Sequence, residues 1–185
     1  GAHSSAALTI PAFTYCTYFL DGEQPARYSR GPRQDYVDVW SDTDYFRAGV
    51  LGRQFGISTI FMSEIDYTGK TAAENEQQTR AWLAVMLPHD VSIWDGHVKD
   101  RSPVKTWHKI VNDLDFLNQP PRLYPYWGTG KYKVVEHNNP ELLATLYRQN
   151  DRALLILSNF GEEKEFTVKL NLENLKLRPQ TAIDL

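Results

Sequence analysis

The stretch Ser58-Thr-Ile-Phe-Met-Ser-Glu-Ile-Asp66 decides the fold. Its first half is a short, nearly continuous apolar and β-branched run, which is typical of a strand buried on both faces of a parallel sheet. Two carboxylates, Glu64 and Asp66, follow this run. In parallel sheets and barrels, the groups that do chemistry lie just beyond the carboxyl ends of the strands. The sequence therefore predicts that Glu64 and Asp66 lie at such an edge.

Two other stretches repeat the same order of an apolar run followed by polar groups. These runs span residues 7–20 and 91–94, and the polar groups after them are Asp21, Glu23, Asp95 and His97. Three parallel strands that end at one edge would bring these side chains to one site. The alternative is that two or three of the acids only form turns, since Asp-Gly pairs are common there.

Helices alternate with these predicted strands. Apolar residues at helical spacing predict helices over 44–55, 72–87 and 103–116, with strands over 14–20, 57–64 and 90–94. Thr71 or Thr68 is the expected N-cap of the second helix, and Pro88 is expected to end it. This alternation indicates an α/β region with a parallel sheet.

The pattern changes at Gln119-Pro-Pro-Arg122, because paired prolines cannot continue a helix. Period-two alternation then predicts strands over 131–136, 142–148, 153–158 and 165–172. We expect an antiparallel module with one solvent-exposed face. The predicted organisation is therefore α/β over residues 1–118, followed by an all-β module over 119–185.

Composition restricts the classes of partner. The chain has 185 residues, 42% of them hydrophobic, with a net charge of −3. This composition predicts a protein that binds neither nucleic acid nor membrane. The single cysteine, Cys16, cannot form an internal disulfide and is expected in the core. Aromatic residues make up 12% of the chain, which suits stacking on sugar rings or a thick ordinary core.

Other side chains have two interpretations each. Arg27, Arg30 and Arg33 belong to a predicted loop and would form surface ion pairs or hold a hydroxyl or carboxylate in a cleft. Trp40 and Trp94 would be core residues or stacking platforms. No metal-ligand spacing, phosphate loop or dinucleotide fingerprint is present, so no metal or cofactor is predicted.

The C-terminal part resembles a known architecture. Leu146 to Asn159, the acidic turn after it and the alternating Phe166 to Leu172 are similar to the small β-sandwich that follows the catalytic barrel in many glycoside hydrolases. Pro125-Tyr-Trp127 and the preceding helix with Trp107 resemble the end of the barrel in proteins distantly similar to glycoside hydrolase family 123.

This resemblance implies a partial (β/α) barrel over residues 1–118 and a carbohydrate partner, and it implies an extracellular or periplasmic location. A whole (β/α)8 barrel takes about 250 residues. Three alternatives follow: the chain is a fragment of a longer protein, two half-barrels pair as a homo-oligomer, or the first region is a small open α/β sheet.

Glycosidases need two carboxyl groups about 5 to 9.5 Å apart across the scissile bond. The expected catalytic residues are Glu64, Glu23 and Asp95, and the expected substrate-binding residues are Asp21, Asp66, Trp94, His97 and Trp40. Family 123 enzymes use the acetamido group of the substrate with an adjacent Asp-Glu pair. This sequence contains no adjacent Asp-Glu pair. A non-catalytic carbohydrate-binding module and a structural or interaction module therefore remain as alternative functions.

Overall fold

The computed structural model describes residues 1–3, 14–22, 43–47, 57–63, 65 and 69–178. The chain divides into two compact units, residues 1–105 and 106–185. The division falls within helix α6 (Ser102–Asp113), ahead of the boundary predicted near residue 119. No helix in the described residues is long and apolar enough to cross a membrane.

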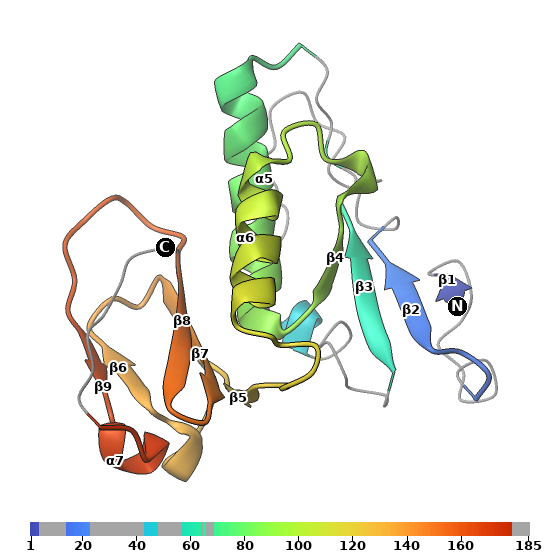
Figure 1. Ribbon diagram of the computed structural model, residues 1–185. Coiled ribbons are helices and arrows are strands. Elements are labelled where there is room, and N and C mark those ends of the chain that lie inside the picture. The colour runs from blue at the N-terminus through green and yellow to red at the C-terminus, as the bar shows by residue number, and fades with distance from the viewer. Residues whose placement is uncertain (4–13, 23–42, 48–56, 64, 66–68, 179–185) are drawn as a thin grey trace. The chain divides into compact units, whose positions relative to one another are not determined.

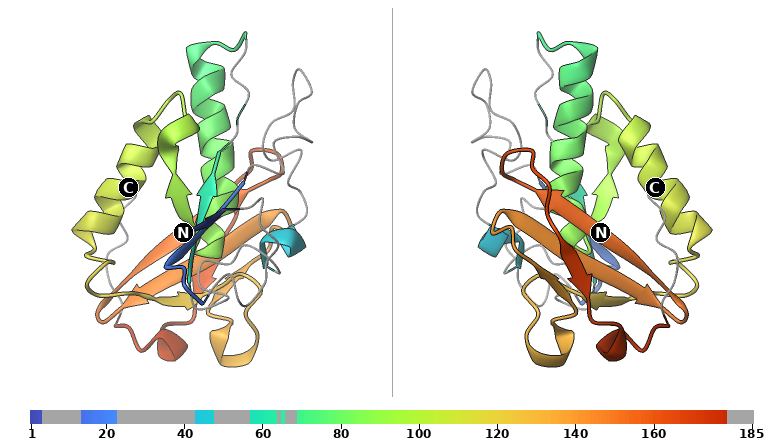
Figure 2. Two further views of the ribbon diagram at one scale, coloured as in Figure 1. Left: turned by 90° about the vertical axis from the view of Figure 1, so that its right-hand side faces the viewer. Right: turned by 90° about the vertical axis from the view of Figure 1, so that its left-hand side faces the viewer.

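The first unit is built on a parallel sheet with the order β1-β2-β3-β4. Its elements are β1 (Ala2–His3), β2 (Tyr18–Asp21), α4 (Thr43–Tyr45), β3 (Ser58–Met62), α5 (Ala72–Met86) and β4 (Ser92–Trp94). Figures 1 and 2 show α5 along one face of this sheet. The helix starts beyond the carboxyl ends of the strands and runs back, which makes β3-α5-β4 a crossover unit (Figure 1).

The predicted α/β organisation is confirmed at this level. The described strands form an open sheet and not a closed barrel. Helix α5 begins where its sequence predicts, because Thr71 and Glu74 form a reciprocal capping box. The strand predicted from residue 14 is shorter than expected, since residues 14–15 form a turn and β2 starts at Tyr18.

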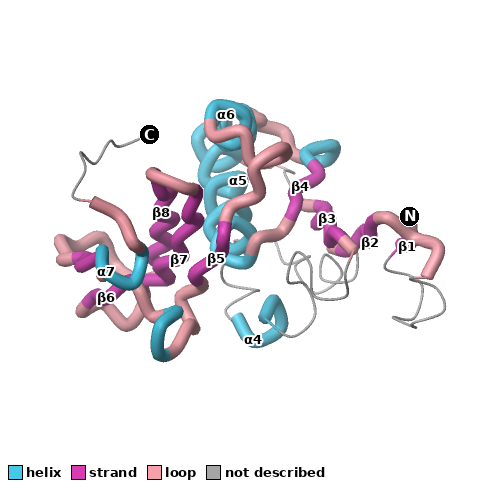
Figure 3. Tube along the Cα trace, turned by 60° about the horizontal axis from the view of Figure 1, so that its bottom comes forward, coloured by secondary structure: helices cyan, strands magenta, loops and turns pink. Residues whose placement is uncertain are grey.

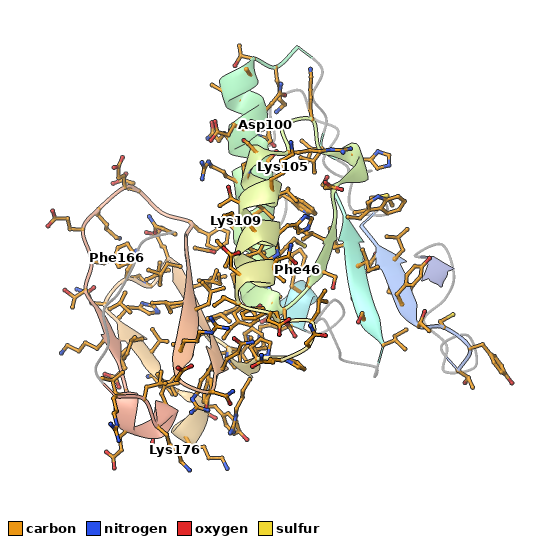
Figure 4. All side chains as sticks on the ribbon, in the orientation of Figure 1. Phe46, Asp100, Lys105, Lys109, Phe166 and Lys176 are labelled. Carbon is orange, nitrogen blue, oxygen red and sulfur yellow. The ribbon has the colours of Figure 1, made fainter. Side chains whose placement is uncertain are left out.

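The core of the first unit lies between the sheet and the crossover helix. Phe61 of β3 is fully buried, as are Trp82 and Met86 of α5. Phe46, labelled in Figure 4, joins them: its ring centroid lies 5.8 Å from that of Phe61 and 5.3 Å from that of His89. The expected core position of Cys16 is wrong, because its side chain is partly exposed.

The second unit consists of two small antiparallel sheets with the orders β5-β7-β8 and β6-β9. Its elements are β5 (Arg122–Tyr124), β6 (Val135–His137), β7 (Leu142–Gln149), β8 (Arg152–Asn159), β9 (Val168–Leu170) and α7 (Leu172–Leu175). Figure 3 shows β5, β7 and β8 side by side. The core contains Tyr124, Val134, Leu146 and Leu175.

Three details of the β prediction are corrected. Strand β9 covers only residues 168–170, because Asn171 caps α7 by accepting the N–H of Asn174. The strand predicted from residue 131 starts at Val135, after a 3₁₀ turn. The expected exposed face is absent at β7, where the side chains of both faces are buried or half-buried. Phe116 packs on the face opposite the core, with its ring 6.0 Å from that of Tyr147.

Candidate functional site

Three parallel strands end at the same edge of the first sheet. The register pairs Asp21 of β2 with Phe61 of β3, and Met62 of β3 with Trp94 of β4. The strand ends that carry Asp21 and Asp95 are therefore separated by one strand. Because neighbouring strands lie about 4.8 Å apart, these two strand ends are about 10 Å apart. Two of the predicted site residues thus lie at one carboxyl edge.

The end of β2 lies close against β3. The carboxylate of Asp21 is buried and accepts the N–H of Gly22 at 2.7 Å. Gly22 has φ = 111°, and a Cβ there would lie 2.2 Å from the carbonyl oxygen of Met62. Only glycine fits this position. The hydrogen bond from Gly22 holds the Asp21 carboxylate at the edge, and the alternative prediction that this aspartate forms a turn depends on residues outside the described part of the chain.

At the end of β4, residues Trp94 to His97 lie close to one another. The indole of Trp94 lies over Gly96, where a Cβ would be 2.5 Å from Nε1. His97 meets the indole in an edge-on contact, with ring centroids 6.1 Å apart. The guanidinium of Arg101 lies 3.9 Å from the carboxylate of Asp95. Trp94 is 41% exposed, so the core interpretation of this tryptophan is wrong.

Ser63 is a site residue that the sequence prediction missed. It follows β3 directly, its side chain is fully buried, and its Oγ has no hydrogen-bond partner in the described part of the chain. Burying a hydroxyl without a partner costs free energy, which gives a reason to look for a ligand that supplies one. The only sequence signal was its place between the apolar run and Glu64.

The buried face of α5 is polar in its first half. Asn75, Gln78 and Thr79 are all buried there, whereas the second half buries apolar side chains. Figure 1 shows that this first half belongs to the end of α5 near the carboxyl edge of the sheet. The amide oxygen of Asn75 has no hydrogen-bond partner among the described residues. The sequence prediction treated this stretch only as helix.

Thr79 ties α5 to the segment that follows β4. Its hydroxyl Oγ1 lies 2.9 Å from the carbonyl oxygen of Asp100. Asp100, labelled in Figure 4 before α6, accepts hydrogen bonds from both the N–H and the hydroxyl of Ser102. These two bonds hold the pKa of the Asp100 carboxyl below its usual range. The segment that carries Asp95 and His97 is therefore anchored at its far end.

His89 is buried within the same unit but serves packing. Its Nδ1–H donates to the carbonyl of Val85 at 2.6 Å, and its ring stacks against Phe46. Burial, helped by the positive charge of Arg47, lowers the pKa of His89 from 6.5 to about 4 although the Val85 bond opposes this. His89 precedes β4, so it lies at the end of that strand opposite Asp95.

The remaining predictions lie outside the described residues. These residues are Glu23, Arg27, Arg30, Arg33, Trp40, Glu64 and Asp66. Within the described ranges, no group of three His, Cys, Asp or Glu residues could hold a metal ion. The described part of the site therefore consists of Asp21, Ser63, Asn75, Trp94, Asp95 and His97.

Comparisons with known proteins add no relative. No protein-family model matches the sequence, and no curated protein or solved structure matches it either.

Proposed function

We propose that this chain is a glycoside hydrolase-like protein that acts on or binds carbohydrate. On this proposal it is the C-terminal portion of an enzyme with a (β/α) barrel and a β-sandwich. The supporting observation is the carboxyl edge of the parallel sheet. There β2 and β4 place Asp21 and Asp95 on the two sides of the strand that leads to Ser63 and then Glu64.

The spacing of the strands suits a pair of carboxyl groups. Retaining glycosidases hold theirs about 5 to 5.5 Å apart and inverting ones about 6.5 to 9.5 Å apart. Adjacent strands lie about 4.8 Å apart, just below the first range, and alternate strands lie about 10 Å apart, just above the second. Glu64 paired with a neighbour would favour retention, whereas Asp95 acting with a group at the end of β2 would favour inversion. In both cases we assign Glu64, Glu23 and Asp95 to catalysis.

The other groups would bind the sugar. Trp94 is exposed enough for its indole to contact the apolar face of a pyranose. Asp21, Ser63, Asn75 and His97 carry the donors and acceptors that sugar hydroxyls need, and Asp66 and Trp40 join them in this proposal. Ser63 and Asn75 have buried oxygen atoms with no hydrogen-bond partner in the described part of the chain, which a hydroxyl would supply.

The test is hydrolysis and binding of a panel of aryl glycosides and neutral and acidic oligosaccharides by the full chain. We expect turnover of at least one substrate, lost by a factor of about 10³ or more in Glu64→Gln. The matched control is Glu76→Gln, an exposed residue on α5 that pairs with Arg80. Turnover that is equal in Glu64→Gln and wild type would overturn the assignment of Glu64.

A non-catalytic carbohydrate-binding or interaction module is the second candidate. It is favoured by the absence of an adjacent Asp-Glu pair in the sequence and by the backbone hydrogen bond that occupies the Asp21 carboxylate. Oligosaccharide binding without turnover, weakened equally by Trp94→Ala and Ser63→Ala, would support it. Neither binding nor turnover would exclude both carbohydrate functions.

The open parallel sheet also suits pairing with another protein chain. We propose that a second half-barrel, from a further copy or another chain, adds to the sheet. Measuring the mass of the full chain in solution tests this. A monomer at all concentrations, with no binding of a dye that reports apolar surface, would contradict the half-barrel.

A further inference from the structure

The second unit has a pocket walled by aromatic rings. Tyr124, Tyr126 and Tyr132 line it together with Lys133, His137 and Ala144. Its interior holds about 10 Å³, which is space for a single water-sized atom. A sugar ring cannot enter, but one oxygen of a ligand can. The rim, where Tyr132 is 42% exposed, is the surface that a larger ligand would contact.

Cations gather on these rings. The guanidinium of Arg122 lies over Tyr124 at 5.2 Å and over Tyr132 at 5.3 Å. The ammonium of Lys131 lies 5.4 Å from the centre of the Tyr132 ring. Such contacts hold the two cations in place at the rim. Lys133 contributes a third exposed cation to the same pocket.

A second arginine, Arg148, is paired with Arg122 on the neighbouring strand. The antiparallel register pairs Arg122 of β5 with Arg148 of β7. Like charges at directly opposed strand positions repel each other. The Nε of Arg148 is buried and has no hydrogen-bond partner in the described part of the chain, although its Nη2 donates to the carbonyl of Asn150. An anion between or beside the two groups would relieve this repulsion.

Among the described residues, none of these cations has a carboxylate partner. The ion pairs found among residues 69–178 include neither Arg122 nor Arg148, and neither Lys131 nor Lys133. Glu136 lies between two lining residues of β6, so alternation directs it to the other face. Glu141 lies near the opposite end of β7 and is 3.4 Å from Lys164.

His137 adds a polar group to the pocket wall. It lines the pocket, and its buried Nδ1 has no hydrogen-bond partner in the described residues. One oxygen atom in the pocket could hydrogen-bond this nitrogen. The combination is a recess for one oxygen, aromatic rings around it and a rim of cations that have no carboxylate partner in the part of the chain that the structure describes.

From this arrangement we infer that the second unit carries a binding site for an acidic saccharide, one whose carboxylate or sulfate group meets Arg122, Lys131 and Lys133 while its ring contacts Tyr132. The anion site stands on the geometry alone. The choice of a saccharide among anions rests on the proposed carbohydrate function. Arginine suits this role because its planar fork matches a carboxylate or sulfate with two parallel hydrogen bonds.

The experiment is calorimetric titration of the full chain at low salt with oligogalacturonate, a sulfated oligosaccharide, a neutral oligosaccharide of equal length and inorganic sulfate. We expect one or both acidic saccharides to bind and the neutral one not to bind. Affinity should fall as salt is raised, because exposed charges are screened. The first two ligands distinguish carboxylate from sulfate as the recognised group.

Variants locate the site. We expect Arg122→Gln and Lys131→Gln each to weaken binding by about tenfold or more, and Arg122→Lys to restore part of the loss. Arg80→Gln, which removes an exposed arginine from α5 of the first unit, should leave affinity unchanged. Thermal melting of each variant checks folding, and Lys131 is exposed, so its substitution keeps the fold intact.

Several results would overturn the inference. These are equal binding of the neutral and acidic saccharides, binding of inorganic sulfate only, or an Arg80→Gln effect as large as that of Lys131→Gln. Loss of turnover in Glu64→Gln with acidic saccharide binding intact would show that the two sites are separate. Failure of the anion site would leave the hydrolase proposal standing, because the two are measured with different variants.

Discussion

At the carboxyl edge of the parallel sheet, β2 ends in an aspartate and β4 is followed by one, whereas the pocket of the antiparallel unit collects arginine and lysine on tyrosine rings. Residues 1–105 contain 13 acidic and 10 basic residues, and residues 106–185 contain 10 of each. The net charge of −3 therefore belongs to residues 1–105, whereas residues 106–185 are neutral overall although cations gather on their tyrosine rings. The difference teaches that overall charge says little about what each surface binds.

Buried polar groups in both units are of two kinds: some satisfy backbone groups, and others have no hydrogen-bond partner in the described part of the chain, among them His137 and Arg148 of the second unit. In the second unit, Thr145 accepts the N–H of Tyr126, and Gln149 donates to the carbonyl of Gln119. Those side chains satisfy backbone groups and so serve folding. In the first unit, the buried oxygens of Ser63 and Asn75 have no hydrogen-bond partner among the described residues. Unsatisfied groups at a strand end are what a binding site retains for its ligand.

The largest effect should come from the close approach of the strands in the first unit. Gly22→Ala combines a positive φ with a Cβ that meets the Met62 backbone, so we expect a loss of more than about 3 kcal/mol in the free energy of unfolding. Urea titration followed by tryptophan fluorescence measures it.

Gly130→Ala in the second unit is the matched control. Its φ is also positive, at 56°, but no heavy atom lies within 4 Å of the added Cβ. We expect a cost of only about 1 kcal/mol. Equal costs for the two substitutions would show that Gly22 is not held against the backbone of β3.

The next largest effect is that low pH should lower the stability of the first unit more than that of the second. Since the folded pKa of His89 is about 4 and its ordinary value is 6.5, the unfolded chain takes up a proton in this interval and the folded chain does not. The stability that neutral His89 confers is complete above pH 6.5. It falls by up to about 3 kcal/mol as pH drops toward 4.

Amide hydrogen exchange at pH 7.5 and 4.5 measures this loss residue by residue. We expect the loss in the first unit, and His89→Gln should flatten the pH dependence there. His108→Gln, which removes an exposed histidine of α6, is the control. A pH dependence that persists unchanged in His89→Gln would contradict the role of this histidine.

The smallest expected changes in stability come from removing two buried hydroxyl groups, one from each unit. Thr145→Val leaves the N–H of Tyr126 without this partner, so we expect a cost of about 1 to 2 kcal/mol. Ser63→Ala removes a hydroxyl that has no partner in the described residues, so we expect stability within about 0.5 kcal/mol of wild type or slightly higher.

The same two substitutions should affect saccharide binding in the opposite order. We expect Ser63→Ala to weaken it and Thr145→Val to leave it unchanged, as measured by titration of both variants. A Ser63→Ala variant that is less stable and binds normally would show that Ser63 is a structural residue.

The sequence predicted well those elements that are specified by neighbouring residues. Thr71, one of the two threonines predicted as N-cap, starts α5, and the apolar runs of β7 and β8 placed that hairpin within one residue. It predicted poorly where local patterns competed. The alternation over 165–172 continued past Asn171, whose side chain starts α7 instead.

The site was only partly predictable for the same reason. An aspartate after each of two apolar runs predicted groups at one edge, and the parallel register of β2, β3 and β4 places Asp21 and Asp95 there. Ser63 and Asn75 gave no signal, because a serine or an asparagine is unremarkable until its burial and its missing partner are known.

The sequence alone predicted the longer helices and strands of the described residues and the change from α/β to β, because these follow from periodicity and caps within a few residues, but it missed β1, β5 and α7. The tertiary structure alone decided that the sheet of the first unit is open, that Trp94 is exposed and that Arg122 faces Arg148. These features depend on strand pairing and burial between residues far apart in the chain, which no local pattern specifies.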